Sequence, residues 1–378
     1  MRAAGWLFGG LTAAAAGYYA GVIWAAGKFR VRRPRPARRP PISILKPLKG
    51  VDADLYDNLV SHVEQDYPDF ELLFAAADAD DPALAAAERL KREYPQRRVE
   101  IFVGGSQAEG NPKVALLELL EPQARHDWLL VNDADVRAPA GYLDALAEAA
   151  GGREVGLVTC PYRARPGATA AGWLDALWIS ADFAGQALLG RKLPGPGFAL
   201  GATMLVRRED LARIGGFRAL RPYLADDYQL GARIAALGRT VRFAPTVVEL
   251  RLGDPGWRDV WKRHLRWART VRASRPGGHF GLVVTFGILW SALLVAAAPR
   301  PATAALALGS IALRLASARA VGAGALQADF VRRAFWLAPL VELWSAAVWA
   351  ASLVSRTVEW RGKRFRLDRL GRLERVSG

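Results

Sequence analysis

The chain has 378 residues, a net charge of +16 and a single cysteine, Cys160. One cysteine excludes an intramolecular disulfide and any metal site built from several cysteines. The length allows one sizeable globular domain with additional segments, and the basic residues gather beside apolar runs, which favours attraction to anionic lipid headgroups over nucleic-acid binding.

Uncharged runs lie near both ends of the chain. Residues 4–27 can cross about 30 Å of hydrocarbon. This run is longer than the apolar part of a cleaved signal peptide, so we expect a retained anchor over residues 1–28. C-terminal transmembrane helices are expected from runs at about 281–298 and 334–354, with 301–326 as a further candidate. The number of C-terminal crossings stays open.

A basic, proline-rich segment follows the first apolar run. Residues 29–41 form a stiff, extended linker, and by the positive-inside rule the domain after it is cytoplasmic. The basic tail, residues 357–378, which includes Arg361, is expected on the same side. The excess of arginine over lysine and the abundant alanine indicate a GC-rich bacterial genome, so the expected location is a bacterial inner (cytoplasmic) membrane.

The middle of the chain alternates short apolar runs with amphipathic segments. Strands are predicted over 42–45, 70–76, 99–103 and 128–131, with helices over 52–65, 83–94 and 113–120 between them. Strands that alternate with helices of this length form βαβ units and a mostly parallel sheet. We therefore predict an α/β domain over residues 42–250, with ligands bound at the carboxyl ends of its strands.

Acidic residues follow two of the predicted strands. Asp80 and Asp81 come after the second strand, and Asp133 and Asp135 close the fourth. Two carboxylates around a small residue can hold a hard divalent cation, Mg²⁺ or Mn²⁺, that bridges diphosphate oxygens. The competing interpretations are an aspartate-rich turn and, for Asp81 before Pro82, capping of the next helix.

Three further segments supply polar groups or a close turn. Lys113 begins a helix after a glycine-containing loop, and a helix N-terminus can bind an anion. Asp227, before the predicted helix 229–237, is the candidate general base, with helix capping as the rival role for Asp226. Residues 194–206 are a glycine-rich loop that runs into a strand; its backbone either approaches a partner closely or only turns.

Residues 257–272 predict an amphipathic helix within an interfacial segment, 251–280. Tryptophans on its apolar face suit a lipid headgroup interface. Arg263 and Arg266 are three residues apart and project from one side, with Trp267 beside them. Paired guanidinium groups fit a diphosphate, and simple attraction to lipid is the alternative interpretation.

Seven short motifs follow one another along the chain: KPLKG at 46–50, QDYP at 65–68, DADDPA at 78–83, NPK at 111–113, NDAD at 132–135, ADDY at 225–228 and RHLRW at 263–267. This ordered set resembles the ceramide glucosyltransferases, family 21 of the glycosyltransferases. The resemblance covers about residues 1–280 and is weaker in the C-terminal spans, 281–356. It implies a GT-A fold, a UDP-sugar donor, a divalent metal and inversion at the anomeric carbon.

The resemblance also implies roles for individual residues. The family pattern of three aspartates and (Q/R)xxRW maps onto Asp81, Asp133 and Asp227 and onto Arg263, Arg266 and Trp267. Together with the residue patterns and motifs above, it leads us to expect a catalytic base, a donor-binding set, a diphosphate or acceptor set and a metal-binding pair. These are, in the same order, Asp227; Lys46, Asp80, Asp81, Lys113 and Asp133; Arg263, Arg266 and Trp267; and Asp133 with Asp135. Family members need not keep the second acid of this pair, so the resemblance supports metal binding by Asp133 more strongly than by Asp135.

The acceptor is expected to be a membrane lipid. The resemblance implies transfer of glucose from UDP-glucose to ceramide. Bacterial hopanoid glycosyltransferases, which carry N-acetylglucosamine to a hopanoid hydroxyl, share the motif set, so the motifs do not separate the two acceptors. A processive polysaccharide synthase would need a larger membrane channel than these few spans offer. The intact acids argue against a catalytically inactive, lipid-binding scaffold.

Overall fold

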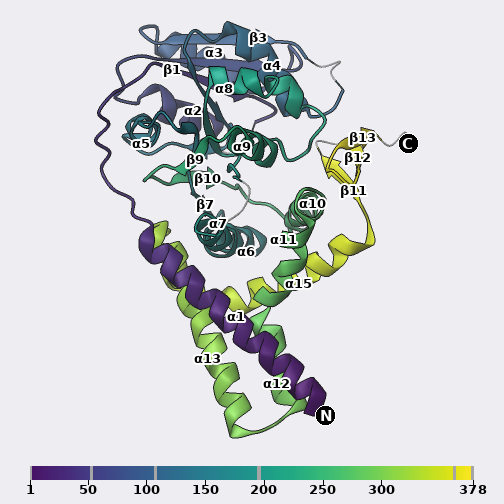
Figure 1. Ribbon diagram of the computed structural model, residues 1–378. Helices are drawn as coiled ribbons and strands as arrows, with labels where there is room; N and C mark the ends of the chain where they lie inside the picture. The colour runs from purple at the N-terminus through teal and green to yellow at the C-terminus, as the bar shows by residue number, and fades with distance from the viewer. Residues whose placement is uncertain (1, 52–53, 106–108, 194–196, 361–362, 376–378) are drawn as a thin grey trace. The chain divides into compact units, whose positions relative to one another are not determined.

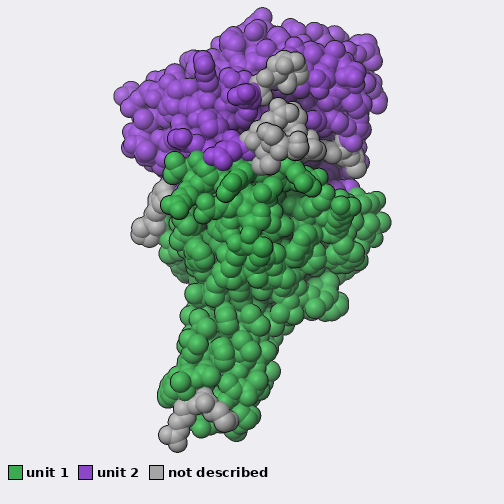
Figure 2. Space-filling model, turned by 90° about the vertical axis from the view of Figure 1, so that its right-hand side faces the viewer, with its two compact units in different colours: residues 1–30, 163–194, 254–370 green, residues 31–162, 195–253, 371–378 purple. Residues whose placement is uncertain are grey.

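The computed structural model describes residues 2–51, 54–105, 109–193, 197–360 and 363–375. Arg361 of the basic tail and the start of the predicted glycine-rich loop lie outside these ranges. The chain forms two compact units (Figure 2). Unit 1 contains residues 1–30, 163–194 and 254–370, and unit 2 contains residues 31–162, 195–253 and 371–378.

Unit 2 is built on a seven-stranded sheet in the order β3-β2-β1-β4-β8-β6-β9. The strands are β1 (Ile42–Pro47), β2 (Phe70–Ala76), β3 (Arg98–Val103), β4 (Trp128–Asn132), β6 (Val155–Thr159), β8 (Thr203–Arg207) and β9 (Thr240–Phe243). Neighbours among β1 to β4 pair in parallel, as predicted. β8 runs antiparallel between β4 and β6, which makes the sheet mixed at that point.

Helices pack against the sheet and bury the apolar side chains of its strands. They are α2 (Leu55–Val63), α3 (Ala83–Glu93), α4 (Pro112–Leu120), α5 (Tyr142–Ala149), α8 (Arg208–Arg213) and α9 (Asp226–Ala236), with short turns η1 (Glu121–Gln123) and η3 (Phe217–Leu220). Leu117 of α4 and Leu230 of α9 join one core cluster with Leu45, Val131 and Val206 of the strands. This packing fixes where α4 and α9 begin, at the edge of the sheet that carries the candidate site.

Smaller elements complete unit 2. β5 (Val136–Arg137) pairs antiparallel with β10 (Val248–Arg251). β7 (Tyr162–Arg165) lies where the chain passes from unit 2 to unit 1. β13 (Leu373–Arg375) brings the end of the chain back to unit 2.

Unit 1 is helical apart from a β-hairpin (Figure 1). Its helices are α1 (Arg2–Lys28), α6 (Ala170–Leu177), η2 (Trp178–Phe183), α7 (Ala184–Gly190), α10 (Trp257–Ser274), α11 (Pro276–Gly281), η4 (Leu282–Thr285), α12 (Gly287–Ala297), α13 (Pro301–Ala318), η5 (Arg319–Ala325), α14 (Val331–Ala334), η6 (Phe335–Leu337) and α15 (Ala338–Val354). The hairpin is β11 (Thr357–Trp360) with β12 (Lys363–Leu367).

Three helical stretches in the described residues are long and apolar enough to cross a membrane: Ala3–Lys28, Pro301–Ala325 and Val331–Val354. A bent pair, Pro276–Thr285 with Gly287–Ala297, makes a fourth candidate. The apolar run 281–298 is therefore not one straight helix, because it bends by 51° between these two parts.

Polar side chains hold the bend. The Tyr19 hydroxyl accepts from the Gly287 N–H at 3.2 Å, and a carboxylate oxygen of Glu342 accepts from the Ile288 N–H at 2.6 Å. Arg314 lies 3.2 Å from Glu342 and 2.7 Å from Asp182. Arg314 and Glu342, two of the charged residues that interrupt apolar runs in the sequence, thus neutralise each other inside unit 1.

Candidate active site

The carboxyl ends of β1, β2 and β4 lie at one edge of the sheet, because these strands are parallel neighbours. One Asp81 carboxylate oxygen accepts from the Gly50 N–H after β1, at 2.9 Å, and from the Ala83 N–H of α3, at 3.0 Å. Asp81 therefore bridges two loops of this edge and satisfies the first turn of α3. Asp80 is exposed beside it.

Lys113 lies at the centre of a cluster of carboxylates. Asn111 caps α4 by accepting from the Lys113 and Val114 N–H groups. The Lys113 ammonium is 2.6 Å from Asp133, which follows β4, and 3.7 Å from Asp226 at the start of α9. Burial lowers the pKa of Lys113, but the two carboxylates outweigh it, and the net pKa is raised. Lys113 thus stays positively charged and joins three elements of unit 2.

Asp227 shares this environment. Burial raises the pKa of Asp227 to about 6, the charge of Asp226 adds to this, and Lys113 opposes it. Its side chain accepts from the Tyr228 N–H at 2.7 Å, while its neighbour Asp226 is buried and accepts from the Asn111 amide at 3.3 Å. A carboxylate with this pKa can accept a proton near neutral pH.

The glycine-rich loop before β8 approaches Asp227 closely. A Cβ atom added at Gly201 would lie 3.1 Å from an Asp227 carboxylate oxygen. Gly231 of α9 is packed more tightly, since a Cβ there would lie 2.4 Å from the Ala199 backbone nitrogen. The close approach expected for this loop is therefore to α9 and its acidic start.

Replacement of Gly231 by alanine is expected to lower the free energy of unfolding by about 1–3 kcal/mol, because the new methyl group would overpack the contact between α9 and residues 198–199. Thermal unfolding of the detergent-solubilised protein measures this change. Gly309→Ala is the matched control, because nothing lies within 4 Å of a Cβ atom at Gly309. An equal effect in both variants would contradict the packing argument.

Lys46 has a supporting position. It is fully buried, and its ammonium donates to the Asn132 side-chain oxygen and, at 3.0 Å, to the Asp133 backbone oxygen. Lys46 therefore stabilises the turn that carries Asp133 through contacts on the buried side of that turn. The motif assigns Lys46 to donor binding, and these contacts put it next to Asp133 of the same set.

The unfolding free energy of the protein should depend on pH because of Lys46. Burial lowers its pKa to about 7, against the attraction of Asp133 and Asp135. Above pH 7 the unfolded chain holds a proton that the folded protein lacks, so stability rises with pH up to the ordinary lysine pKa. The unfolding free energy of the wild type relative to Lys46→Met should rise by at most about 1.4 kcal/mol per pH unit between pH 7 and 9. Denaturant titrations at several pH values measure the unfolding free energy of both proteins. If it changes with pH equally in the wild type and in Lys46→Met, the lowered pKa of Lys46 is contradicted.

The donor set at Asp133 and Asp135 fits a shared metal site. Among the described residues, no group of three or more histidine, cysteine, aspartate or glutamate side chains could hold a metal ion alone. Mg²⁺ commonly binds through one or two carboxylates together with substrate phosphates and waters. The Asp133 side chain is 37% exposed, and Asp135 is partly exposed two residues later. These two carboxylates therefore suit a cation that a diphosphate helps to bind.

The RHLRW residues lie in unit 1, on α10, whereas the acids lie in unit 2. Arg263 is 2.5 Å from one oxygen of the buried Asp175, and His264 Nε2 is 2.9 Å from the other. The Trp344 indole donates to His264 Nδ1 at 3.0 Å, so Nε2 carries the proton and donates to Asp175.

Aromatic rings pack around His264. The Trp178 ring is 4.4 Å from the His264 ring and stacks on the Trp267 ring at 5.4 Å. Asp175 was missed in the sequence, where the only signal is a single acid within an apolar helix. Asn111 and Asn132 were missed as supporting residues, although both stand inside quoted motifs.

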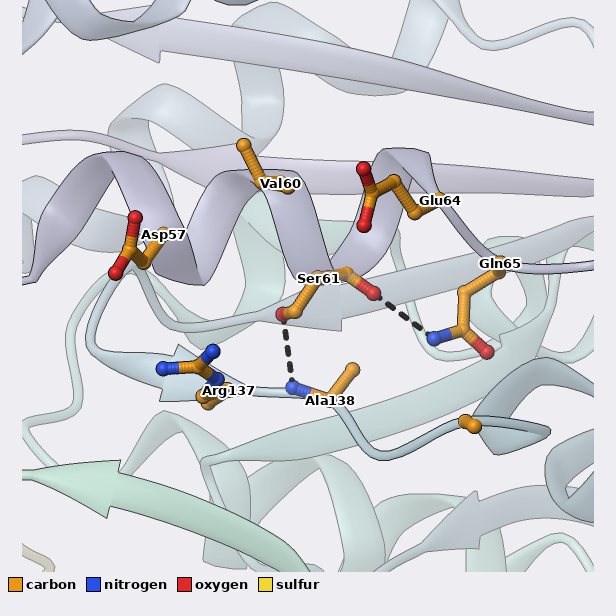
Figure 3. A pocket seen from close by; sticks show the side chains of 8 residues that line it. Asp57, Val60, Ser61, Glu64, Gln65, Arg137 and Ala138 are labelled. Atoms are coloured by element: carbon orange, nitrogen blue, oxygen red, sulfur yellow. Dashed lines mark hydrogen bonds between the residues drawn. The ribbon is translucent and has the colours of Figure 1, made fainter.

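A separate polar hollow of about 330 Å³ lies beside α2 (Figure 3). It is lined by Asp57, Val60, Ser61, Glu64, Gln65, Arg137, Ala138 and Ala140. None of these is a predicted site residue. The Ser61 hydroxyl accepts from the Ala138 N–H at 3.0 Å, and Gln65 donates to the Ser61 backbone oxygen at 2.8 Å. These polar atoms serve the local fold, so the hollow is not the candidate site.

Comparison with known proteins decides the family. The family model described as glycosyl transferase family 21 matches residues 9–373. The chain belongs to glycosyl transferase family 21. The resemblance drawn from the motifs is thereby confirmed, and it extends into the C-terminal helices of this family 21 protein.

Curated relatives of the family 21 chain are ceramide glucosyltransferases. Ceramide glucosyltransferase 3 of Caenorhabditis elegans is 29% identical over 202 residues, which cover 53% of this chain and 43% of the relative. The ceramide glucosyltransferase of Komagataella phaffii is 31% identical over 137 residues, or 35% of this chain and 27% of the relative. The chain therefore spans less than half the length of these relatives.

A solved structure confirms the fold. The mannosyltransferase PcManGT from Pyrobaculum calidifontis, in complex with GDP-Man and Mn²⁺, superposes with a TM-score of 0.53 at 20% identity. The match covers 92% of the family 21 chain and 98% of the mannosyltransferase. The predicted GT-A fold with apolar terminal helices is thus confirmed.

Proposed function

We propose that this family 21 protein is an inverting glycosyltransferase that moves a hexose from a UDP-sugar to the hydroxyl of a membrane lipid. Glucose and ceramide are the first candidates, given the names of the curated relatives. The observation that carries the proposal is the cluster at the carboxyl edge of the sheet, where Lys113 lies between Asp133 and Asp226 and next to Asp227.

The donor would lie across the carboxyl ends of β1, β2 and β4. Asp80 and Asp81 would contact the nucleoside, and Lys113 the negative charge of the diphosphate, which the contacts of Asp81 and Lys113 at this edge support. Asp133, with Asp135, would hold Mg²⁺ or Mn²⁺, which neutralises diphosphate charge when bound. Lys46 and Asn132 fix the turn that presents Asp133.

Asp227 would act as the general base. Its carboxylate takes the proton of the lipid hydroxyl as that oxygen forms a bond to the anomeric carbon. The bond from the anomeric carbon to the diphosphate oxygen breaks on the opposite face, and UDP leaves with the bonding electrons. A single displacement of this kind inverts the anomeric configuration. Lys113 stabilises the charge that develops on the leaving group.

Arg263, Arg266 and Trp267 of α10 are proposed to bind the diphosphate or the acceptor, as the family motif implies. Asp175 already pairs with Arg263 and fixes its guanidinium group. Arg263 would therefore contribute a preorganised donor with part of its charge neutralised, and Arg266 a second guanidinium group for the diphosphate. The domain itself is proposed to face the cytoplasm at a bacterial inner membrane.

A transfer assay tests the function. The full chain in lipid vesicles is incubated with Mn²⁺, UDP-glucose or UDP-N-acetylglucosamine, and vesicles that contain ceramide or a hopanoid. Mass spectrometry of the lipids is expected to show a hexosylceramide from UDP-glucose. If the product is an N-acetylglucosaminyl hopanoid instead, the protein is still a glycosyltransferase, but its donor is UDP-N-acetylglucosamine and its acceptor is a hopanoid. Tight UDP binding without a glycosylated lipid, in the assay and in cells that express the gene, would refute the proposed activity.

A further inference from the structure

The segment 254–370 of unit 1 is flanked on both sides by residues of unit 2. Unit 2 runs up to residue 253 and resumes at residue 371. The return is held by hydrogen bonds, from the Leu373 N–H to the Pro222 oxygen at 2.7 Å and from the Leu224 N–H to the Gly371 oxygen at 3.5 Å. All candidate spans lie within unit 1. A segment that leaves and rejoins one unit outside the bilayer must cross the bilayer an even number of times.

The candidate crossings in this segment number three, which is odd. They are the bent pair Pro276–Thr285 with Gly287–Ala297, then Pro301–Ala325, and then Val331–Val354. At least one of the three therefore does not cross, although all of them are apolar enough. The packing of each helix within unit 1 shows which one.

The helices α12 and α13 pack along α1 (Figure 1). A Cβ atom at Gly5 would lie 3.3 Å from Ala298, and one at Gly9 would lie 3.7 Å from Leu294. Close contacts therefore run along α1 and α12 in opposite directions. Helices that pack lengthwise beside an apolar N-terminal span cross the bilayer with it.

The helix α15 packs along α10 instead. Trp344 bonds to His264 at 3.0 Å, and the Arg272 guanidinium donates to the Ser355 backbone oxygen at 2.9 Å. The two helices therefore run in the same direction, side by side. α10 carries five arginines and one lysine, and a helix with that charge stays at the headgroup level. The part of α15 from Trp344 to its end, which is bound to α10, lies at that level too.

The outer side of α15 and the turn before it is apolar. Trp336, Leu340, Leu343 and Val354 are 61%, 57%, 45% and 87% exposed. The spacing of the first three places them on one helix face. The acidic residue of α15, Glu342, points inward to Arg314 and is 3% exposed. The outer face thus has the composition of a surface that enters the acyl chains of one leaflet.

We propose that α15 does not cross the membrane and instead lies in one leaflet beside α10, with its apolar face among the acyl chains. The protein then crosses three times, through α1, α12 and α13. The partner of this face is the lipid surface on the side where unit 2 lies. The proposal concerns the path of the chain and does not rest on the proposed transferase activity.

Cysteine labelling in sealed vesicles tests this topology. The only native cysteine, Cys160, is buried, so it gives little background. Single cysteines are placed at Arg92 in unit 2, Asp329 before α15, Leu370 after it, and Ala302 at the tip between α12 and α13. All four positions are exposed. A membrane-impermeant maleimide is applied to vesicles of each orientation, with labelling in detergent as the measure of full reactivity.

Arg92→Cys, Asp329→Cys and Leu370→Cys are expected to react from one side, and Ala302→Cys from the other. If α15 crosses, Asp329→Cys and Leu370→Cys react from opposite sides, and the proposal fails. It also fails if Asp329→Cys reacts from neither side, since residue 329 would then be buried in the bilayer. Sugar transfer is measured separately, so a loss of activity does not alter the topological result.

Discussion

Replacement of Asp227 by asparagine is expected to lower the turnover number for sugar transfer by about 10²–10⁴-fold, because the general base is lost while the shape of the side chain is kept. The affinity for UDP should change little, since the proposed donor contacts come from Asp81, Lys113 and Asp133. Initial-rate measurements give the turnover number, and calorimetric titration with UDP and Mn²⁺ gives the affinity.

The pH profile provides the control for Asp227. The base must be ionised, and its pKa is raised to about 6 by burial and by Asp226. Wild-type turnover should therefore fall about tenfold per pH unit below pH 6 and be level above it. Any residual activity of Asp227→Asn should lack this acid limb. If Asp227→Asn keeps wild-type turnover, or if its residual activity falls below pH 6 as in the wild type, another residue is the base.

Replacement of Asp133 by asparagine is expected to lower transfer by about 10²-fold or more, because the donor diphosphate loses its main cation-binding carboxylate. The requirement for Mn²⁺ should weaken at the same time. Lys113 also loses the carboxylate at 2.6 Å. The Asp133 charge raises the pKa of Asp227, so the acid limb of the remaining activity should move to lower pH.

Asp69→Asn is the matched control for Asp133→Asn. Asp69 directly precedes β2, so it lies at the amino end of a strand rather than at the carboxyl edge, and its side chain is 60% exposed. Its replacement should leave both turnover and the Mn²⁺ requirement unchanged. Equal losses in the two variants would show a general effect of lowered negative charge, in conflict with a site at the carboxyl edge.

Local patterns were sufficient to predict much of unit 2. The apolar run Phe70–Ala76 forms β2 with those bounds, and all its residues are buried. Asn111-Pro112 begins α4 because the asparagine side chain satisfies two free N–H groups of the first turn. Side-chain periodicity and capping act over a few residues, so the sequence reports them directly.

The sequence also predicted that Asp133 and Asp227 lie near each other. It did not predict which contacts hold them there. Strand order in a parallel sheet predicts that acids at strand ends share an edge. Lys113 was expected to bind an anion at the start of a helix, but its ion pairs with Asp133 and Asp226 were not predicted. Its contacts depend on how α4 and α9 pack against the sheet, which involves residues far apart in the chain.

The sequence by itself determined the α/β class, the acidic edge, the apolar ends and the motifs that mark the family. These features depend on spacing, local hydrogen bonds and hydropathy. Tertiary structure alone decided that Lys46 is buried behind Asp133, that Asp175 holds Arg263, and that α15 lies along a highly charged helix. Each of these is a contact between distant segments, and composition carries no information about which distant partner a buried charge or an apolar helix will meet.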